Sequence, residues 1–153
     1  MTETKDEKGY IFLSQPRRIR NKIYRLEQQK EALEFSLLPG AIRYDKPNVK
    51  HSPEDTMAKI MARIDEIERT IAESKSKLGT VSIDISDAIE EKLDDDNERT
   101  VLTAYFINSQ SMEYIAEQMN YSTRQTYRFW KRGIQNISDT ILSEMSDSED
   151  DII

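Results

Sequence analysis

Four positively charged side chains and no acidic one lie between Tyr121 and Gln135, in a chain that carries 29 acidic and 22 basic residues. Within this stretch Arg124, Gln125 and Arg128 can each present two hydrogen-bonding groups in one plane. Arginine pairs in this way with guanine and glutamine with adenine, while further basic side chains bind phosphates. A carboxylate would repel those phosphates, so the composition of this stretch favours recognition of nucleic acid.

Such side chains need a rigid element, and the flanking residues predict two helices joined by a short turn. Ser111 can cap a first helix that carries the small residue Ala116 and ends at Asn120, a residue that tolerates the left-handed conformation. Ser122 can cap a second helix, with Gln125 completing a capping box. The spacing therefore predicts a helix-turn-helix. The inner face of its second helix is expected to consist of Thr126, Phe129, Trp130, Gly133 and Ile137.

The opposite face of the second helix is the candidate DNA-binding site. The helix N-terminus attracts phosphates, and the remaining side chains supply contacts to base edges and to the backbone. The candidate residues are Ser122, Thr123, Arg124, Gln125, Tyr127, Arg128, Lys131 and Arg132. The alternative is a capped helical hairpin whose basic outer face is merely solvated.

Two heptad-spaced seams occupy the N-terminal half of the chain. Lys30 and Ser74 are the polar members, of the kind that sets register. Paired within one chain across a loop at 39–52, the seams would form an antiparallel hairpin, with helix starts at Ser14 and Ser52. Paired between chains, they would form a homodimer; both remain open. The seams are Ile19, Ile23, Leu26, Lys30, Leu33 and Leu37, then Met57, Ile60, Ile64, Ile67, Ile71, Ser74 and Leu78.

The whole chain is thus expected to be all-α, with a coiled-coil-like N-terminal hairpin followed by a C-terminal helix-turn-helix domain. A flexible N-terminus (1–12) precedes the self-associating hairpin (13–79), which Gly79 should end. A connector helix (80–96) leads to the DNA-binding domain (97–142), whose first helix is capped within "DDDN" at 94–97. The last segment (143–153) has five acids and no base, which predicts a disordered tail that could also cover the basic helix.

Other chemistry has little support in the residues. The chain has no cysteine, its acidic run at Asp94 lacks the glycine and glutamate of a calcium loop, and its only histidine, His51, has no nucleophile set nearby. We therefore expect no catalytic residue, metal, cofactor or small-molecule substrate. No run approaches membrane-spanning length, so a cytoplasmic protein without membrane contact is expected.

A second basic stretch lies near the N-terminus, within "QPRRIRNKIYR". It could bind phosphate or an acidic partner, or it could be the solvated side of a coiled helix. Its basic residues are Arg17, Arg18, Arg20, Lys22 and Arg25.

The stretch "SMEYIAEQMNYSTRQTYRFWKRGIQNI" resembles region 4 of the sigma-70 factors, and more closely the RinA/ArpU type of regulators of Gram-positive phages, which activate late, packaging or lysis genes. "LSQPRRI" at 13–19 and "ERTVLTAYF" at 98–106 extend the resemblance over 13–141. It implies a DNA-binding transcription regulator that acts at a late promoter in the cytoplasm of a bacterial host cell, with a possible contact to RNA polymerase. Three residues depart from the family pattern: Thr126, Trp130 and Gly133. The alternatives are a module that binds RNA polymerase or a host factor without DNA, and a small terminase-like packaging subunit.

Overall fold

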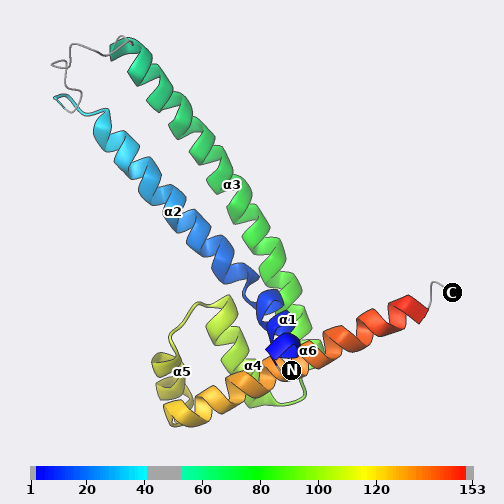
Figure 1. Cartoon of the computed structure of the whole chain (residues 1–153). Helices are drawn as coiled ribbons and strands as arrows, with labels where there is room; N and C mark the ends of the chain where they lie inside the picture. Colours follow the sequence, from blue (N-terminus) through cyan, green and yellow to red (C-terminus); the bar gives the residue numbers. More distant parts are fainter. Residues whose placement is uncertain (1–2, 41–52, 151–153) are drawn as a thin grey trace. The chain divides into compact units, whose positions relative to one another are not determined.

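The computed structural model describes residues 3–40 and 53–150, and every regular element in these two ranges is helical (Figure 1). The elements follow one another with short connections, apart from the segment between α2 and α3. In chain order they are α1 (Glu3–Leu13), α2 (Gln15–Ser36), α3 (Pro53–Lys92), α4 (Asp96–Leu102), the π-helical turn η1 (Thr103–Ile107), α5 (Met112–Met119) and α6 (Thr123–Asp150).

The chain divides into two compact units. Unit 1 consists of Met1–Arg18 and Gly79–Ile153, and unit 2 consists of Ile19–Leu78. The boundaries fall inside α2 and α3, so each of these helices contributes residues to both units.

In unit 2 the two heptad seams face each other within the chain. Ile23, Ile67 and Ile71 are buried together, and seam residues above and below them extend the contact along both helices. Ser74 is also buried at its seam position, 7% exposed, whereas Lys30 is only partly covered. Because a pair of helices can bury only one stripe of each, large apolar side chains remain exposed on unit 2: Tyr24, Phe35, Leu38 and Met61. Met57 is also exposed, at 39%, although the sequence predicted it in the seam.

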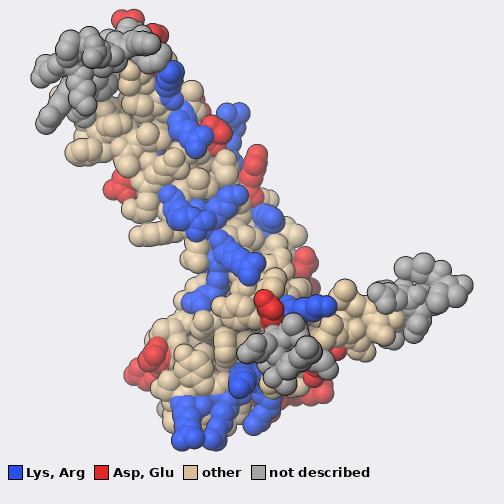
Figure 2. Space-filling view, viewed as in Figure 1, with Lys and Arg blue, Asp and Glu red and all other residues tan. Residues whose placement is uncertain are grey.

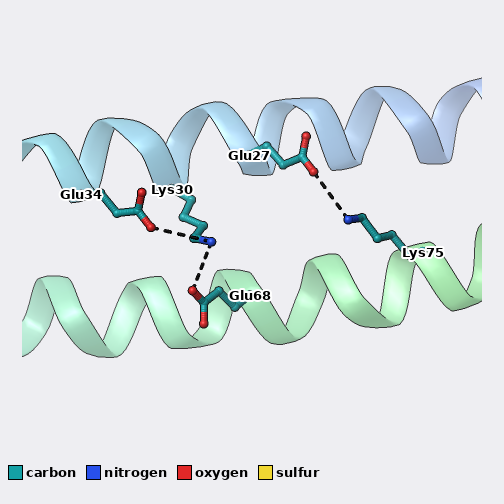
Figure 3. A network of polar contacts seen from close by, with 5 residues as sticks. All are labelled: Glu27, Lys30, Glu34, Glu68 and Lys75. Carbon is teal, nitrogen blue, oxygen red and sulfur yellow. Dashed lines mark ion pairs between the residues drawn. The ribbon is translucent and has the colours of Figure 1, made fainter.

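Ion pairs bridge α2 and α3 along one side of this seam (Figure 3). The ammonium of Lys30 lies 3.1 Å from a carboxylate oxygen of Glu68 and 3.7 Å from one of Glu34, and Lys75 lies 3.9 Å from Glu27. The hydrogen bond and the charge of Glu68 raise the pKa of Lys30, with a smaller contribution from Glu34. The polar seam residue is thus matched by a carboxylate on the facing helix, which favours one register.

Unit 1 has a larger buried core than unit 2. One cluster joins α1, the end of α3, α4, η1 and α6 through Leu13, Ile89, Leu102, Phe106 and Ile137, each completely buried. A smaller cluster packs α5 against α4 and α6 and consists of Val101, Met112, Ile115 and Phe129. The core therefore fixes α5 and α6 relative to the rest of unit 1.

The N-terminal segment is helical, although the sequence analysis predicted that it would be flexible. Residues 3–13 form α1, whose Gly9 crosses α6 so closely that its backbone N–H donates to Oγ of Ser138 at 3.0 Å. A Cβ at Gly9 would lie 2.8 Å from the carbonyl oxygen of Ile134, so only glycine fits there. α2 begins at Gln15, directly after Ser14 as predicted, and the hydroxyl of Ser14 donates back to the carbonyl of Ile11 at 3.2 Å.

Gly79 does not end a helix, contrary to the sequence prediction. α3 continues through it to Lys92, so the separate connector helix expected at 80–96 is the last part of α3 followed by the non-helical residues 93–95. A glycine inside a helix costs about 1 kcal/mol relative to alanine, and burial of Ile85 and Ile89 beyond it offsets that cost. The predicted cap in "DDDN" is confirmed, since Asp95 accepts from the N–H of Glu98 at 3.0 Å.

At the C-terminal end α6 extends to Asp150, whereas disorder was expected from residue 143. The segment after Gly133 contains neither glycine nor proline, so nothing in its sequence ends the helix. Lys92 also holds Glu144 through an ion pair of 2.7 Å. The predicted loop from residue 41 onward, the cap at Ser52 and the histidine lie outside the described residues.

Candidate nucleic-acid interface

The turn between α5 and α6 is held by local hydrogen bonds. Ser111 caps α5 by accepting from the N–H of Tyr114, and Asn120 ends it in the left-handed conformation, at φ 59° and ψ 35°. The N–H of Tyr121 then donates to the carbonyl of Ala116 at 3.1 Å. Ser122 caps α6 by accepting from the N–H of Gln125 at 3.1 Å. The caps and the left-handed turn predicted from the sequence are confirmed.

The inner face of α6 is buried along its first four turns. Thr126 and Ile137 are completely covered, and Phe129, Gly133 and Ile134 are nearly so. Four of these five positions were predicted; Ile134 was missed, although it follows Trp130 by the helical step of four. The burial fixes which side of α6 faces solvent.

The three departures from the family pattern each have a structural explanation. The hydroxyl of Thr126 donates to the carbonyl of Ser122 at 2.9 Å, so its burial leaves no unmet hydrogen bond. Gly133 lies against Leu102, whose Cδ1 would be 2.9 Å from an added Cβ. Trp130 stacks on Phe106 with ring centres 6.2 Å apart and packs edge-on against Tyr105 at 5.5 Å, so the aromatic cluster accommodates its larger ring.

The outer face carries the candidate residues. Arg124, Arg128 and Lys131 recur at steps of four and three and are exposed, as is Tyr127 between them. Arg128 also donates to the side-chain oxygen of Gln125, although the distance of 3.4 Å is long. The remaining candidates, Ser122, Thr123 and Arg132, are exposed as well. Figure 2 shows Lys and Arg side chains gathered over the N-terminal part of α6, and one helix presents all of these groups together.

One acidic residue approaches this face from another element, a feature that the sequence analysis missed. Glu98 of α4 is buried, 3% exposed, and accepts from the side-chain N–H of Asn136 on α6 at 3.0 Å. Burial is the main cause of the raised pKa of Glu98; the charge of Asp95 raises it further, and the charge of Arg132 lowers it. Arg132 therefore has a carboxylate of its own fold nearby, which distinguishes it from Arg124 and Arg128.

Aromatic contacts support the beginning of α6. The ring of Tyr121 packs edge-on against Phe129 at 5.1 Å, and its hydroxyl lies 3.5 Å from the side-chain nitrogen of Asn97. Tyr127 packs edge-on against Trp130 at 6.0 Å. The tyrosine on the outer face is thus attached to the core through the indole, which holds its ring in place beside the two arginines.

The five basic residues of the second stretch do not belong to a single unit. All five residues lie on α2, but Arg17 and Arg18 belong to unit 1 and the other three to unit 2. The guanidinium of Arg17 lies over the ring of Tyr105, 4.1 Å from its centre, so a cation–π contact already occupies it. Arg18, Lys22 and Arg25 are exposed.

The acidic end of α6 is held away from the basic residues of the same helix. Glu144 follows Arg132 by 12 positions, which is about 18 Å along a continuous helix. While α6 persists to Asp150, residues 143–150 cannot fold back over the candidate DNA-binding face. The idea that the tail covers this face within one chain is therefore disfavoured.

Among the residues in the described ranges, no group of three histidine, cysteine or acidic side chains could hold a metal ion. None of the described helices is both long and apolar enough to cross a bilayer. Comparison of the chain with protein-family models, curated proteins and solved structures gave no match.

Proposed function

We propose that the chain is a sequence-specific DNA-binding transcription regulator, in which α5 and α6 act as a helix-turn-helix. The N-terminal half of α6 would lie in the major groove. The observation that carries the proposal is the exposed face of Arg124, Arg128 and Lys131 on a helix that has no acidic residue of its own before Asp139 and whose opposite face is buried. A rigid helix of this charge can approach the phosphates and still present bidentate donors to base edges.

The candidate residues would have different roles. Arg124, Gln125 and Arg128 would read bases, because they lie in the first two turns, which enter a groove most deeply. Ser122 and Thr123 at the N-terminus of α6 would bring backbone N–H groups to a phosphate. Lys131 and Arg132 would contact the backbone farther along, and Tyr127 would pack against sugar or a thymine methyl group. Because of Glu98, Arg132 would contribute least to binding.

The biological setting of the proposal rests on the sequence resemblance. A regulator of the RinA/ArpU type would act at a late promoter of a phage, with a possible contact to RNA polymerase. Within unit 2, the exposed residues Lys22 and Arg25 of the second basic stretch would suit phosphates or an acidic protein surface.

Self-association through unit 2 is the second part of the proposal. The seam residues are used within the chain, so a dimer would instead form through the apolar side chains left exposed on α2 and α3, including Phe35, at 69% exposure, and Met61, at 56%. Two copies would present two α6 helices to an inverted repeat. Sedimentation of the protein and of a Phe35→Ser, Met61→Ser variant tests this, and a monomer in both cases would exclude it.

The DNA-binding proposal is tested by mobility shift on the DNA flanking its own gene, against random DNA, at two salt concentrations. Arg124→Ala or Arg128→Ala should cost about 1–3 kcal/mol at the specific site and relax its sequence preference. Lys131→Ala should weaken binding to the specific site and to random DNA alike, and it should reduce the salt dependence of binding. Arg63→Ala is the matched control, since Arg63 is exposed on unit 2 and pairs with Glu66 at 3.1 Å.

Three outcomes would redirect the proposal. If neither arginine change alters sequence preference, α6 does not read bases. If no DNA is bound at either salt concentration, the protein-binding module becomes the better function. Rings larger than a dimer on packaging DNA would instead favour the terminase-like subunit.

A further inference from the structure

Unit 2 carries basic side chains on the side of its seam that lies opposite the ion pairs of Figure 3. In heptad-spaced helices, residues next to the seam flank it on two sides. Glu27 and Lys75, which pair at 3.9 Å, each directly follow a seam residue. Lys22 and Lys77 each directly precede one, so these two lysines lie on the other side of the seam.

Lys22 and Lys77 also lie at about the same level of the hairpin. α2 and α3 run antiparallel (Figure 1), and Lys30 faces Glu68 at 3.1 Å. Lys22 is eight residues before Lys30, and Lys77 is nine residues after Glu68. Two ammonium groups thus face each other across the seam, at positions where coiled coils usually place opposite charges. Like charges repel, so this pair does not stabilise the hairpin.

A third basic residue extends the group. Arg25 follows Lys22 by three residues and therefore lies on the same side of α2. All three side chains are exposed, and none forms an ion pair with a described residue. Glu73, one turn before Lys77, is exposed and does not pair with it. Figure 2 shows Lys and Arg side chains gathered along α2 and α3. Lys22, Arg25 and Lys77 are called the basic side of unit 2 below.

The chemistry of this side favours a phosphate backbone over a protein surface. Protein interfaces are enriched in aromatic and methionine side chains. The exposed Met61 directly follows the seam residue Ile60, so it lies on the side of the ion pairs. One heptad along from the two lysines, the basic side continues with Gln29 and Thr70, which are neither apolar nor acidic. Basic, amide and hydroxyl side chains are the ones that contact DNA phosphates.

We propose that the basic side of unit 2 binds the phosphate backbone of double-stranded DNA without reading its sequence. Arg25 would hold phosphate oxygens through its planar guanidinium, and the two lysines would act as point charges. A phosphate between Lys22 and Lys77 would also remove their mutual repulsion. The choice of DNA as the partner rests on the proposed function, whereas the anion-binding site does not.

The direct test is the salt dependence of binding to a labelled duplex of random sequence, followed by fluorescence anisotropy between about 50 and 200 mM salt. Each phosphate contact contributes about 0.9 to the slope of log K against log salt concentration. The double variant Lys22→Gln, Lys77→Gln should therefore lower the magnitude of that slope by up to about 1.8 and weaken binding several-fold at the lower salt. An unchanged slope and affinity would overturn the proposal.

The matched control is Arg69→Gln, Lys75→Gln. It removes two exposed positive charges of α3 that lie on other sides of the hairpin, and it should leave the slope unchanged. Equal changes in the two double variants would show only the effect of net charge and would overturn the proposal. Labelled poly-L-glutamate represents an acidic protein surface, and tighter binding of it than of the duplex at the same salt would overturn DNA as the partner.

Thermal melts followed by circular dichroism give a readout that does not involve DNA, and they establish that each variant is folded. Glutamine and lysine have similar helix propensities, so Lys22→Gln, Lys77→Gln should change mainly the repulsion. Its melting temperature should exceed that of the unaltered protein at low salt, and the difference should vanish in 1 M salt, where charges are screened over about 3 Å. A lower melting temperature at low salt would contradict the facing of the two lysines.

The operator separates this proposal from the proposed function. Operator binding that keeps its sequence preference, with no change of slope in Lys22→Gln, Lys77→Gln, would overturn the basic side of unit 2 and leave α6 as the reading helix. Binding without any sequence preference, with a slope that falls in this variant, would overturn the proposed function and leave the basic side standing. A protein that binds neither operator nor random DNA would overturn both.

Discussion

Units 1 and 2 are both helical, but they are stabilised in different ways. Unit 1 buries several faces of its helices around Phe106 and Trp130, where aromatic rings and completely covered aliphatic side chains meet. Unit 2 buries a single seam and adds exposed ion pairs such as Lys30–Glu68 beside it. Burial contributes most to stability and exposed charges contribute little, so unit 1 should be the more stable. The proposed DNA-binding helix lies in this rigid unit.

The largest effect is expected from Phe106→Ala. Phe106 is completely buried and contacts the rings of Tyr10, Tyr105 and Trp130, so its removal leaves a cavity that its neighbours cannot fill. The free energy of unfolding of unit 1 should fall by about 3–5 kcal/mol. Fluorescence of Trp130 follows unit 1 during denaturation, and circular dichroism follows both units. If tryptophan fluorescence reports an unchanged midpoint, the aromatic cluster is not what stabilises unit 1.

Ile67→Ala is the corresponding change in unit 2. Ile67 is 2% exposed in the seam, but only two helices surround it, so water and neighbouring side chains can occupy the space. We expect a loss of about 2–3 kcal/mol, at the lower end for such a change. It should lower the midpoint seen by circular dichroism more than that seen by tryptophan fluorescence. Equal shifts by both probes would show that the two units unfold together and would break the comparison.

A smaller effect on stability is expected from a buried polar group in unit 1. Glu98 is the buried carboxylate of unit 1, and its pKa in the folded state is raised, mainly by burial. The folded state therefore binds the proton more tightly than the unfolded chain. This group destabilises the fold at neutral pH, and that penalty disappears as pH falls through its folded-state pKa. Glu98→Gln keeps an acceptor for Asn136 and should raise the melting temperature at pH 7.

The increase in melting temperature caused by Glu98→Gln should become smaller as the pH falls toward 4, because the carboxyl group of Glu98 becomes protonated. Thermal melts at both pH values measure it. Glu117→Gln, at an exposed position on α5, makes the same charge change and should show no such dependence. A lower melting temperature of Glu98→Gln at pH 7 would mean that the attraction of Arg132 outweighs the cost of burial.

The sequence predicted best what depends on neighbouring residues. The caps at Ser111, Ser122 and Asp95 and the left-handed Asn120 involve groups within three or four positions, so local patterns reveal them. The burial of Thr126, Phe129 and Ile137 followed from helical periodicity alone. The candidate DNA-binding face of α6 could be predicted from the sequence for the same reason.

The features that were missed depend on contacts between distant segments. Gly9 looks like a turn signal until Ser138, which lies 129 positions later, is seen against it. Gly79 resembled a helix end because glycine usually weakens helices, but buried residues on α3 beyond it keep the helix intact. The approach of Glu98 to Arg132 and Asn136 likewise requires α4 to pack on α6.

The smallest effect is expected from Glu68→Gln in unit 2. Glu68 pairs with Lys30 at 3.1 Å, and its hydrogen bond and charge raise the pKa of Lys30 above its ordinary value. The raised pKa means that this stabilisation is fully present at neutral pH and is lost as pH rises through the folded-state pKa of Lys30. Because the pair is exposed, Glu68→Gln should lower the melting temperature only slightly, and the difference should vanish in 1 M salt, where charges are screened over about 3 Å. Glu73→Gln, exposed on the same helix, is the control. A loss that persists in 1 M salt would indicate that Lys30 and Glu68 fix the register of α2 and α3 through their hydrogen bond, so that unit 2 depends on a polar contact as unit 1 depends on its aromatic core.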